Sequence, residues 1–183
     1  SEDWAGYSVS SAGDVDGDGL DDLLMGSPGD GGTFDGEAYL ILGASLGTTS
    51  EIDLSDADYN FVSASTSNGS AGLSVSSAGD VDGDGLDDIL VGAPGDDDAA
   101  PAAGKTYLIL GASLGSSSEI DLSVSGYSFV GEEPFDFATR GRRGLSSAGD
   151  VDGDGRDDLL VGAYANSDGG SYSGKAYLIL SGL

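Results

Sequence analysis

One nine-residue acidic segment occurs three times in this chain, and the rest of the sequence repeats around it. It reads Asp-Val-Asp-Gly-Asp-Gly-Leu-Asp-Asp at Asp14–Asp22 and Asp80–Asp88, and Arg156 replaces the leucine at Asp150–Asp158. The copies begin 66 and 70 residues apart. Repetition at a fixed period predicts one supersecondary unit per copy, stacked on its neighbours. Within one domain of residues 1–183, the predicted units are approximately 1–66, 67–134 and 135–183.

The spacing of these acids predicts a site for a hard, oxygen-seeking cation. Aspartates stand at positions 1, 3, 5 and 9, and glycines at positions 4 and 6 let the loop adopt φ > 0. Ca²⁺ takes six to eight oxygens from carboxylates, backbone carbonyls and water. We expect the first three acids to bind by side chain, position 7 by its carbonyl, and position 9 as a closing, bidentate-capable ligand. The predicted ligands of three Ca²⁺ ions are Asp14, Asp16, Asp18, Leu20, Asp22, Asp80, Asp82, Asp84, Leu86, Asp88, Asp150, Asp152, Asp154, Arg156 and Asp158.

Two other interpretations of the acidic segment are weaker. An EF-hand loop shares the opening Asp-x-Asp-x-Asp-Gly but needs a bidentate Glu at position 12. Position 12 is Met25, Val91 or Val161, each inside an apolar run. A merely solvated turn would explain one isolated acidic cluster, but not three copies with the same acids in register.

Charge limits the partners of this chain. It has 33 acidic and 6 basic residues among 183, for a formal charge of −27, and three bound Ca²⁺ would still leave −21. Such a surface repels nucleic-acid phosphates and anionic lipid. It suits a saline or Ca²⁺-rich medium, and we expect an extracellular or cell-surface location.

The residue types that are missing exclude several chemistries. Without cysteine or histidine the chain has no disulfide framework, no thiolate nucleophile and no imidazole base. No apolar run approaches the ~20 residues that span a bilayer. No signal peptide is visible at Ser1, so we expect either that it was removed or that the chain is part of something larger.

The apolar runs predict short strands and almost no helix. Each unit has a Ser-rich run before the acidic segment, a Leu/Val run after it, a Tyr-Leu-Ile-Leu run and, in two units, an aromatic run. The apolar runs are four or five residues long, bounded by Gly, Pro or Asp, and do not alternate, which is typical of strands buried on both faces. We therefore expect four-stranded antiparallel sheets packed face to face as blades of a β-propeller.

These motifs resemble the FG-GAP repeats of integrin α-subunit β-propellers and their bacterial or archaeal relatives. The Gly-Ala-Pro half is present unchanged at Gly92–Pro94. Serine replaces the alanine at Gly26–Pro28, and tyrosine replaces the proline at Gly162–Tyr164. The Phe-Gly half keeps its glycine at Gly6, Gly72 and Gly144, whereas Ala5, Ala71 and Arg143 replace the phenylalanine. The resemblance implies that the acidic loops join the two innermost strands of each blade and bind Ca²⁺ on one face. It implies ligand contacts from loops on the opposite face.

Two functions are compatible with this pattern. One is a Ca²⁺-binding extracellular adhesion or scaffold module, and the other is an accessory propeller of a secreted polysaccharide-active enzyme or a glycan-binding module. An active site should interrupt the repeat with unique titratable groups, and the acids in register are already explained as Ca²⁺ ligands. We therefore predict that this chain is not an enzyme.

One segment departs from the repeat and is a candidate ligand-binding site. Between the second and third units the chain concentrates half of its basic residues beside two aromatics, in the segment Phe135, Phe137, Arg140, Arg142 and Arg143. Arginines beside aromatics can hold an acidic peptide or a sulfated or carboxylated glycan. Pairing with nearby acids is the alternative, and we favour it. Trp4 and Tyr164 are expected to pack between blades.

The third unit ends before its outer strand, so the sequence predicts eleven strands. Three wedge-shaped sheets cannot surround an axis, since closed propellers typically have four to eight blades. Two apolar sheet faces and one unpaired edge should remain exposed. We expect self-association, as a six-bladed pair or a filament, or completion by the remaining blades of a longer chain.

Overall fold

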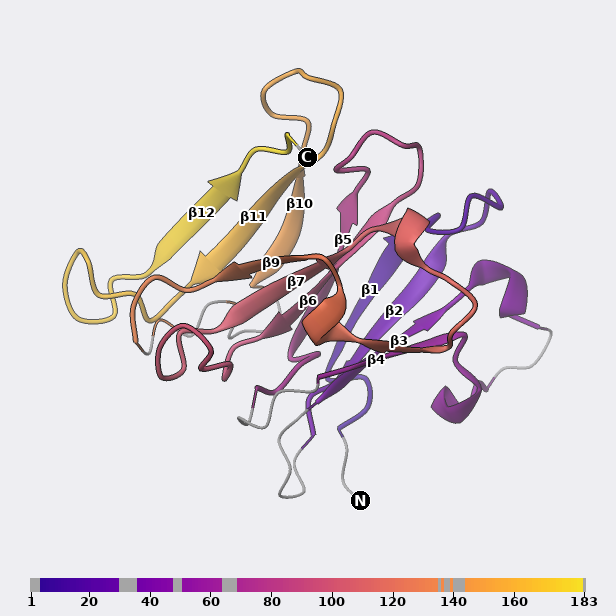
Figure 1. Cartoon of the computed structure of the whole chain (residues 1–183), viewed down its shortest axis with the longest axis horizontal. Coiled ribbons are helices and arrows are strands. Elements are labelled where there is room, and N and C mark those ends of the chain that lie inside the picture. Colours follow the sequence, from indigo (N-terminus) through magenta and orange to yellow (C-terminus); the bar gives the residue numbers. More distant parts are fainter. Residues whose placement is uncertain are drawn as a thin grey trace.

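Three sheets follow the three sequence units in order across the molecule (Figure 1). The computed structural model describes residues 4–29, 36–47, 51–63, 69–134, 136, 139 and 144–182. Short 3₁₀ turns are the helical elements of this described part, and no helix in it is long and apolar enough to cross a membrane. The turns are η1 (Gly43–Ser45), η2 (Leu54–Asp56), η3 (Gly111–Ser113) and η4 (Leu122–Val124).

The N-terminal sheet is built on four antiparallel strands in chain order, as the sequence predicted. They are β1 (Ser8–Gly13), β2 (Asp22–Ser27), β3 (Glu37–Ile41) and β4 (Tyr59–Val62). The acidic loop connects β1 to β2, and Met25 pairs with Val9 on one side and Tyr39 on the other. The register of β1 on β2 shifts between Ser11 and Gly13, where the chain turns into the loop.

The middle and C-terminal sheets repeat this plan. The middle sheet contains β5 (Ser74–Gly79), β6 (Asp88–Ala93), β7 (Lys105–Ile109) and β9 (Tyr127–Val130). The C-terminal sheet contains β10 (Leu145–Gly149), β11 (Asp158–Ala163) and β12 (Lys175–Ile179). A fourth strand is absent from this sheet in the described part of the chain, as predicted.

The described residues form twelve strands, one more than the eleven that the sequence predicted. The additional strand is β8 (Glu119–Asp121). It belongs by sequence to the second unit, yet it pairs in parallel with β4 of the N-terminal sheet, placing Ile120 opposite Phe61. It lies in the connection between β7 and β9 of that unit. Pairing is favourable because it satisfies the outer edge of β4, where the Asn60 N–H donates to the Ser118 carbonyl at 2.7 Å.

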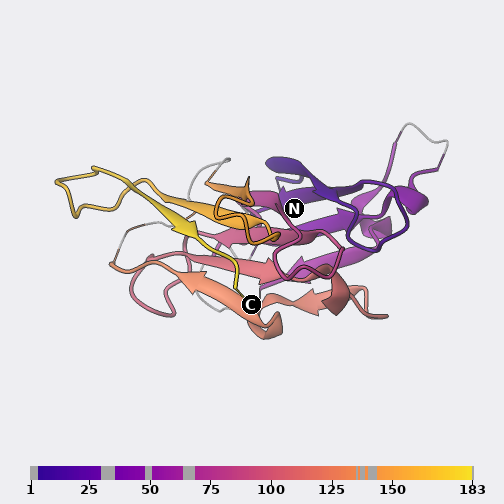
Figure 2. The same cartoon turned by 90° about the horizontal axis from the view of Figure 1, so that it is seen from above.

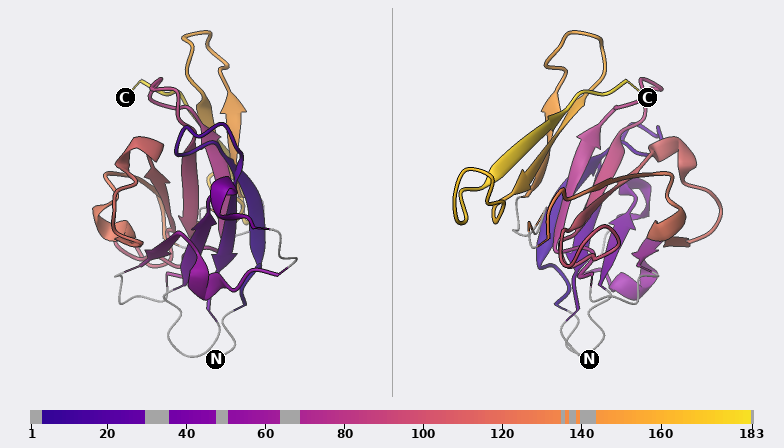
Figure 3. Two further views of the ribbon diagram at one scale, coloured as in Figure 1. Left: turned by 90° about the vertical axis from the view of Figure 1, so that its right-hand side faces the viewer. Right: turned by 60° about the vertical axis from the view of Figure 1, so that its left-hand side comes forward.

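The sheets pack face to face as layers, which Figure 2 shows from above and Figure 3 from two sides. The first strands β1, β5 and β10 lie next to one another at the centre of the arrangement, so the acidic loops join the innermost strands. All six residues of β6 are buried, because the middle sheet is covered on both faces. The three sheets do not close into a ring.

The outer faces of this stack are apolar and exposed. On the N-terminal end face, Val9 is 67% exposed, whereas its counterpart Val75 is 5% exposed. On the C-terminal end face, Leu178 is 52% exposed, whereas its counterpart Leu108 is fully buried. Leu23 and Leu160 are exposed on the same two faces, respectively.

The register corrects one part of the Phe-Gly assignment. Leu145 pairs with Val161 as Val75 pairs with Val91, so Gly144 corresponds to Ser74 and not to Gly72. Gly144 lies two residues closer to its acidic segment than Gly6 and Gly72 lie to theirs. The assignment of Arg143 to the family's phenylalanine depended on this glycine and is not supported.

Candidate metal centre

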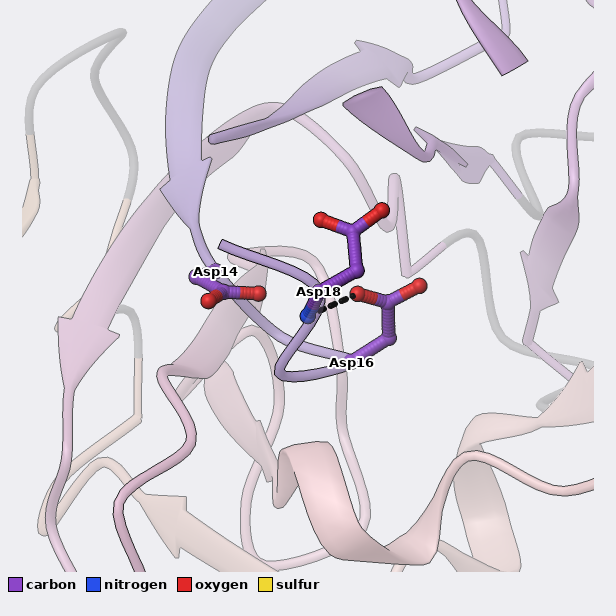
Figure 4. A group of neighbouring side chains, drawn as sticks. All are labelled: Asp14, Asp16 and Asp18. Carbon is purple, nitrogen blue, oxygen red and sulfur yellow. Dashed lines mark hydrogen bonds between the residues drawn. The ribbon is translucent and has the colours of Figure 1, made fainter. Parts of the chain in front are cut away.

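Each acidic loop is held in shape by hydrogen bonds from its own backbone to its aspartates. In the first copy the Asp14 carboxylate accepts from the N–H groups of Gly17 (2.8 Å) and Gly19 (2.9 Å). Asp16 accepts from the Asp18 N–H at 3.1 Å, and Asp18 accepts from the Leu20 N–H at 2.8 Å. Figure 4 shows these three carboxylates on one tight loop. The acids thus order the turn as well as lining it.

The other two loops repeat the same bonds. Asp80 accepts from Gly83 (2.7 Å) and Gly85 (2.9 Å), and Asp150 accepts from Gly153 (2.6 Å) and Gly155 (2.9 Å). All six loop glycines at positions 4 and 6 have φ between +77° and +92°, as the sequence predicted.

The ninth residue of each loop is buried and fixes the loop to the chain beyond the third strand. Asp22 is 0% exposed, and its two oxygens accept from the N–H groups of Val15 (2.9 Å) and Gly43 (2.7 Å). Asp88 accepts equivalently from Val81 and Gly111, both at 2.9 Å. Both oxygens of this residue are therefore already hydrogen-bonded, which leaves only their second lone pairs for a metal.

Burial makes two of these closing carboxylates easier to protonate. Desolvation raises the pKa of Asp22, and it raises the pKa of Asp88 to about 6. Hydrogen bonds from the backbone of Ser181 and then Val151 lower the pKa of Asp158. A cation at the loop would favour the ionised form of all three.

The carboxylates converge in each loop closely enough to share one ion. In each group one oxygen per residue lies within 4.8 Å of the others. Two oxygens bound to one Ca²⁺ at about 2.3–2.6 Å are separated by no more than about 5 Å, so the spread fits. Carboxylates suit a hard cation better than a soft one. The groups are Asp14 with Asp16 and Asp18, Asp80 with Asp82 and Asp88, and Asp150 with Asp152 and Asp158.

Not every predicted ligand joins these groups. Asp22, Asp84 and Asp154 stand outside them among the described residues, although each lies on its loop. Leu20, Leu86 and Arg156 donate their N–H groups to the aspartate two residues earlier. Metal ligation by their carbonyls remains a prediction.

A second function of the acidic segment was missed by sequence reasoning. The eighth residue crosses to the preceding sheet, where Asp87 accepts from the Asp14 N–H at 2.9 Å and donates its own N–H to the Asp14 carbonyl at 3.0 Å. Asp157 forms the same pair with Asp80, at 3.2 and 3.0 Å. The Asp-Asp doublet at positions 8 and 9 recurs in all three copies, and that was the available signal.

Glycine at the entry to the loop makes this crossing possible. A Cβ added to Gly13 would lie 2.0 Å from Asp87 Oδ2, and one added to Gly79 would lie 1.8 Å from Asp157 Oδ2. Gly149 has the same positive φ, yet its Cβ would meet nothing within 4 Å among the described residues. The C-terminal sheet therefore carries the receiving half of an inter-sheet junction that no neighbour completes in this part of the chain.

The remaining candidate residues fall into two groups. Phe135, Phe137, Arg140, Arg142 and Arg143 lie outside the described residues, so the proposed anion-binding segment stays a prediction. Trp4 stacks on Tyr7 of its own unit, with ring centroids 5.9 Å apart. Trp4 and Tyr164 are 51% and 50% exposed, so neither is buried between the described sheets, and their packing against a further blade stays a prediction.

Comparison with known proteins supports the repeat assignment. The FG-GAP repeat profile matches residues 5–41, 71–109 and 145–179, one match in each sheet. The chain is 34% identical to integrin alpha-PS2 of Drosophila melanogaster over 175 residues, which is 90% of this chain and 12% of that protein. It is 34% identical to integrin alpha-5 of Xenopus laevis over 169 residues, 87% of this chain and 14% of that protein.

The family matches cover more than half of the chain and contain all three acidic segments. The relatives are several times longer, so the likeness concerns one region of each. Sheet order, loop position and repeat motifs agree with a β-propeller-type fold made of integrin α-like units. This chain belongs to the FG-GAP repeat family.

Proposed function

We propose that each acidic loop binds one Ca²⁺ ion, three in all, and that the ions stabilise the folded chain. The observation that carries this is the convergence of three carboxylates in every copy of the loop. Carboxylates gathered so closely repel one another unless a cation neutralises them. The resident ion would supply that neutralisation and link the loop to the two innermost strands.

Ca²⁺ fits this site better than Mg²⁺. The loop offers carboxylate and backbone oxygens on a turn already shaped by its own hydrogen bonds. Ca²⁺ accepts irregular sets of six to eight oxygens, whereas Mg²⁺ demands near-octahedral geometry and gives up water reluctantly. Extracellular modules often bind Ca²⁺ with dissociation constants of about 10⁻⁴–10⁻³ M, and we expect these loops to fall in that range.

The module acts, in this proposal, as an extracellular adhesion or scaffold element. Its similarity to integrin α chains over almost its whole length favours this function over catalysis. The charge of −27 favours a Ca²⁺-rich exterior. A test is to coat beads with the chain and to count adherent cells in Ca²⁺ and in EDTA. The Ca²⁺ concentration is about 2 mM, above the dissociation constants expected of extracellular modules.

A variant of the chain serves as the control, because it distinguishes adhesion that needs the acidic loops from adhesion by the rest of the surface. A chain with Asp16, Asp82 and Asp152 all changed to alanine removes one carboxylate from each group. Adhesion that needs the loops should fall to the EDTA level with this variant. Equal adhesion of both proteins in Ca²⁺ and EDTA would contradict the proposal. Binding to a glycan array, with no cell adhesion, would favour the glycan-binding alternative.

The partners of the end faces are, in this proposal, further FG-GAP units. Val9 and Leu23 of the N-terminal end face correspond to residues that pack between sheets elsewhere, as do Leu160 and Leu178 of the C-terminal end face. The two faces are the complementary halves of one junction. In a solution of this chain alone, the further unit is a second copy joined head to tail, whereas in a longer chain it is the next blade.

A further inference from the structure

The two junctions between neighbouring sheets are built from equivalent residues, but the first contains a segment that has no counterpart in the second among the described residues. Between the N-terminal and middle sheets, Ile120 and Leu122 pack into the shared apolar core, and Leu122 is only 1% exposed. They come from β8 and η4, in the segment Ser118-Glu-Ile-Asp-Leu-Ser123. This segment closes the outer end of the junction.

The junction between the middle and C-terminal sheets contains a groove at the corresponding place. It has a volume of about 220 Å³ and is mainly apolar. Phe129, Val161, Tyr177 and Ile179 line it. Their counterparts by strand register are Phe61, Val91, Tyr107 and Ile109, and all four of these are at most 2% exposed in the closed junction.

The strand edge beside this groove also lacks the partner that its counterpart has. Ser128 of β9 occupies the register position of Asn60, whose N–H donates to Ser118 of the β8 segment. No strand pairs with this edge of β9 among the described residues. Thr106 lines the groove, and its buried hydroxyl has no hydrogen-bond partner in the described part of the chain. An open edge and an apolar groove together are a template for strand addition.

We propose that this groove binds an extended segment of another polypeptide that carries an Ile-x-Leu pair between acidic residues. The segment pairs in parallel with β9, and its two aliphatic side chains fill the groove beside Phe129 and Ile179. The chain's own Ile120 and Leu122 show that this sequence type fits a site built from equivalent residues. The groove is continuous with the packed core of the junction, which includes Phe129, Tyr177 and Ile179.

The test is titration of a fluorescein-labelled peptide with the sequence Ser-Glu-Ile-Asp-Leu-Ser-Val-Ser, taken from residues 118–125, followed by anisotropy. A second peptide with aspartate in place of both aliphatic residues is the control. We expect saturable binding of the first peptide and at least about tenfold weaker binding of the second, since burial of each aliphatic side chain favours binding. Absent binding, or equal binding of both, would overturn the proposal.

A matched pair of variants tests the parallel pairing. Ser128→Pro removes the exposed edge N–H of β9, where proline is tolerated because that group faces solvent. It should weaken peptide binding about tenfold while leaving the unfolding temperature unchanged. Asn60→Pro removes the equivalent N–H from a pair formed within the chain, so it should lower the unfolding temperature and leave peptide affinity unchanged. Unchanged affinity in Ser128→Pro would contradict strand addition.

The other candidate donor is a second copy, because Glu51–Ser55 repeats the motif and Ile52 is 39% exposed. If a second copy is the occupant, its Ile52 segment competes with the peptide, so the peptide will bind Ile52→Asp chain more tightly than wild-type chain. That result would overturn donation by a different polypeptide. Equal peptide affinity for the two chains supports it.

Discussion

The Asp87 carboxylate accepts a hydrogen bond from the Asp14 N–H at 2.9 Å, and the Asp87 N–H donates to the Asp14 carbonyl at 3.0 Å. Asp14 also opens the first acidic loop. In the first two loops, the opening aspartate thus lies in its own candidate ion site and is also held by an aspartate of the next loop, on the neighbouring sheet. The proposed metal binding and the sheet packing would therefore be coupled at the same position.

Replacing Asp87 with alanine should destabilise the chain by about 1–3 kcal/mol, because it leaves the half-buried Asp14 N–H without an acceptor. Asp21→Ala is the matched control, since Asp21 is exposed at the end of the stack and its change removes the same charge. It should alter stability by no more than about 0.5 kcal/mol. Thermal unfolding measures both, at about 2–4 °C for each kcal/mol in a chain of this size. Equal losses in the two variants would contradict the cross-sheet role of Asp87.

Alanine substitutions at Gly79 and Gly149 distinguish the cost of backbone strain from the cost of a steric clash with the neighbouring sheet. Both have positive φ, +73° and +71°, so alanine pays the same backbone cost at each. Only at Gly79 would the new Cβ also collide with the Asp157 carboxylate. Gly79→Ala should therefore be less stable than Gly149→Ala by about 1–3 kcal/mol, the usual cost of overpacking. Urea unfolding of the two variants should show this difference, and equal midpoints would refute it.

The buried Asp96 should make stability depend on pH. Its pKa is raised by desolvation above the ordinary value of 3.8, so the folded chain binds this proton more tightly than the unfolded chain does. Its contribution to stability is complete below pH 3.8 and is lost as the pH rises through the raised pKa. Asp96→Asn removes this loss, and Asn166 shows that asparagine fits the equivalent position of the third unit.

The measurement is the free energy of unfolding of wild type and Asp96→Asn at pH 4 and pH 7, at one Ca²⁺ concentration. The variant should gain stability relative to wild type as the pH rises. Carboxylates that do not interact with Asp96 titrate equally in both proteins and cancel in the comparison. A difference that stays constant between the two pH values would exclude Asp96 as the source.

The exposed end faces predict self-association of the isolated chain. Sedimentation velocity should detect species larger than the 18.1 kDa monomer. Leu178→Asp places a charge on the C-terminal end face and should shift the population to monomer. Val124→Asp, at a residue 76% exposed on η4, makes the same change away from the end faces and should leave association intact. A wild-type chain that stays monomeric would contradict head-to-tail pairing of these faces.

Sequence periodicity predicted the three sheets because each apolar run is short, bounded by turn residues and repeated. It also located the acidic loops, since a carboxylate spacing that orders a turn is visible in one dimension. It did not predict β8, because Glu119–Asp121 pairs with a strand of the preceding unit, and such pairing follows from how sheets stack. The role of Asp87 between the sheets was not predicted for the same reason, because its partner Asp14 is 73 residues away. Gly144 was misaligned because two residues are missing from an approach that otherwise repeats.

Calcium titration by calorimetry tests the central claim most directly. The account predicts three sites per chain in the wild type and two in Asp82→Ala, which removes one carboxylate from the second group only. It also predicts an unfolding temperature that rises with free Ca²⁺ and falls in EDTA, because binding favours the folded state. No heat of binding, together with the same unfolding temperature in Ca²⁺ and in EDTA, would contradict the account.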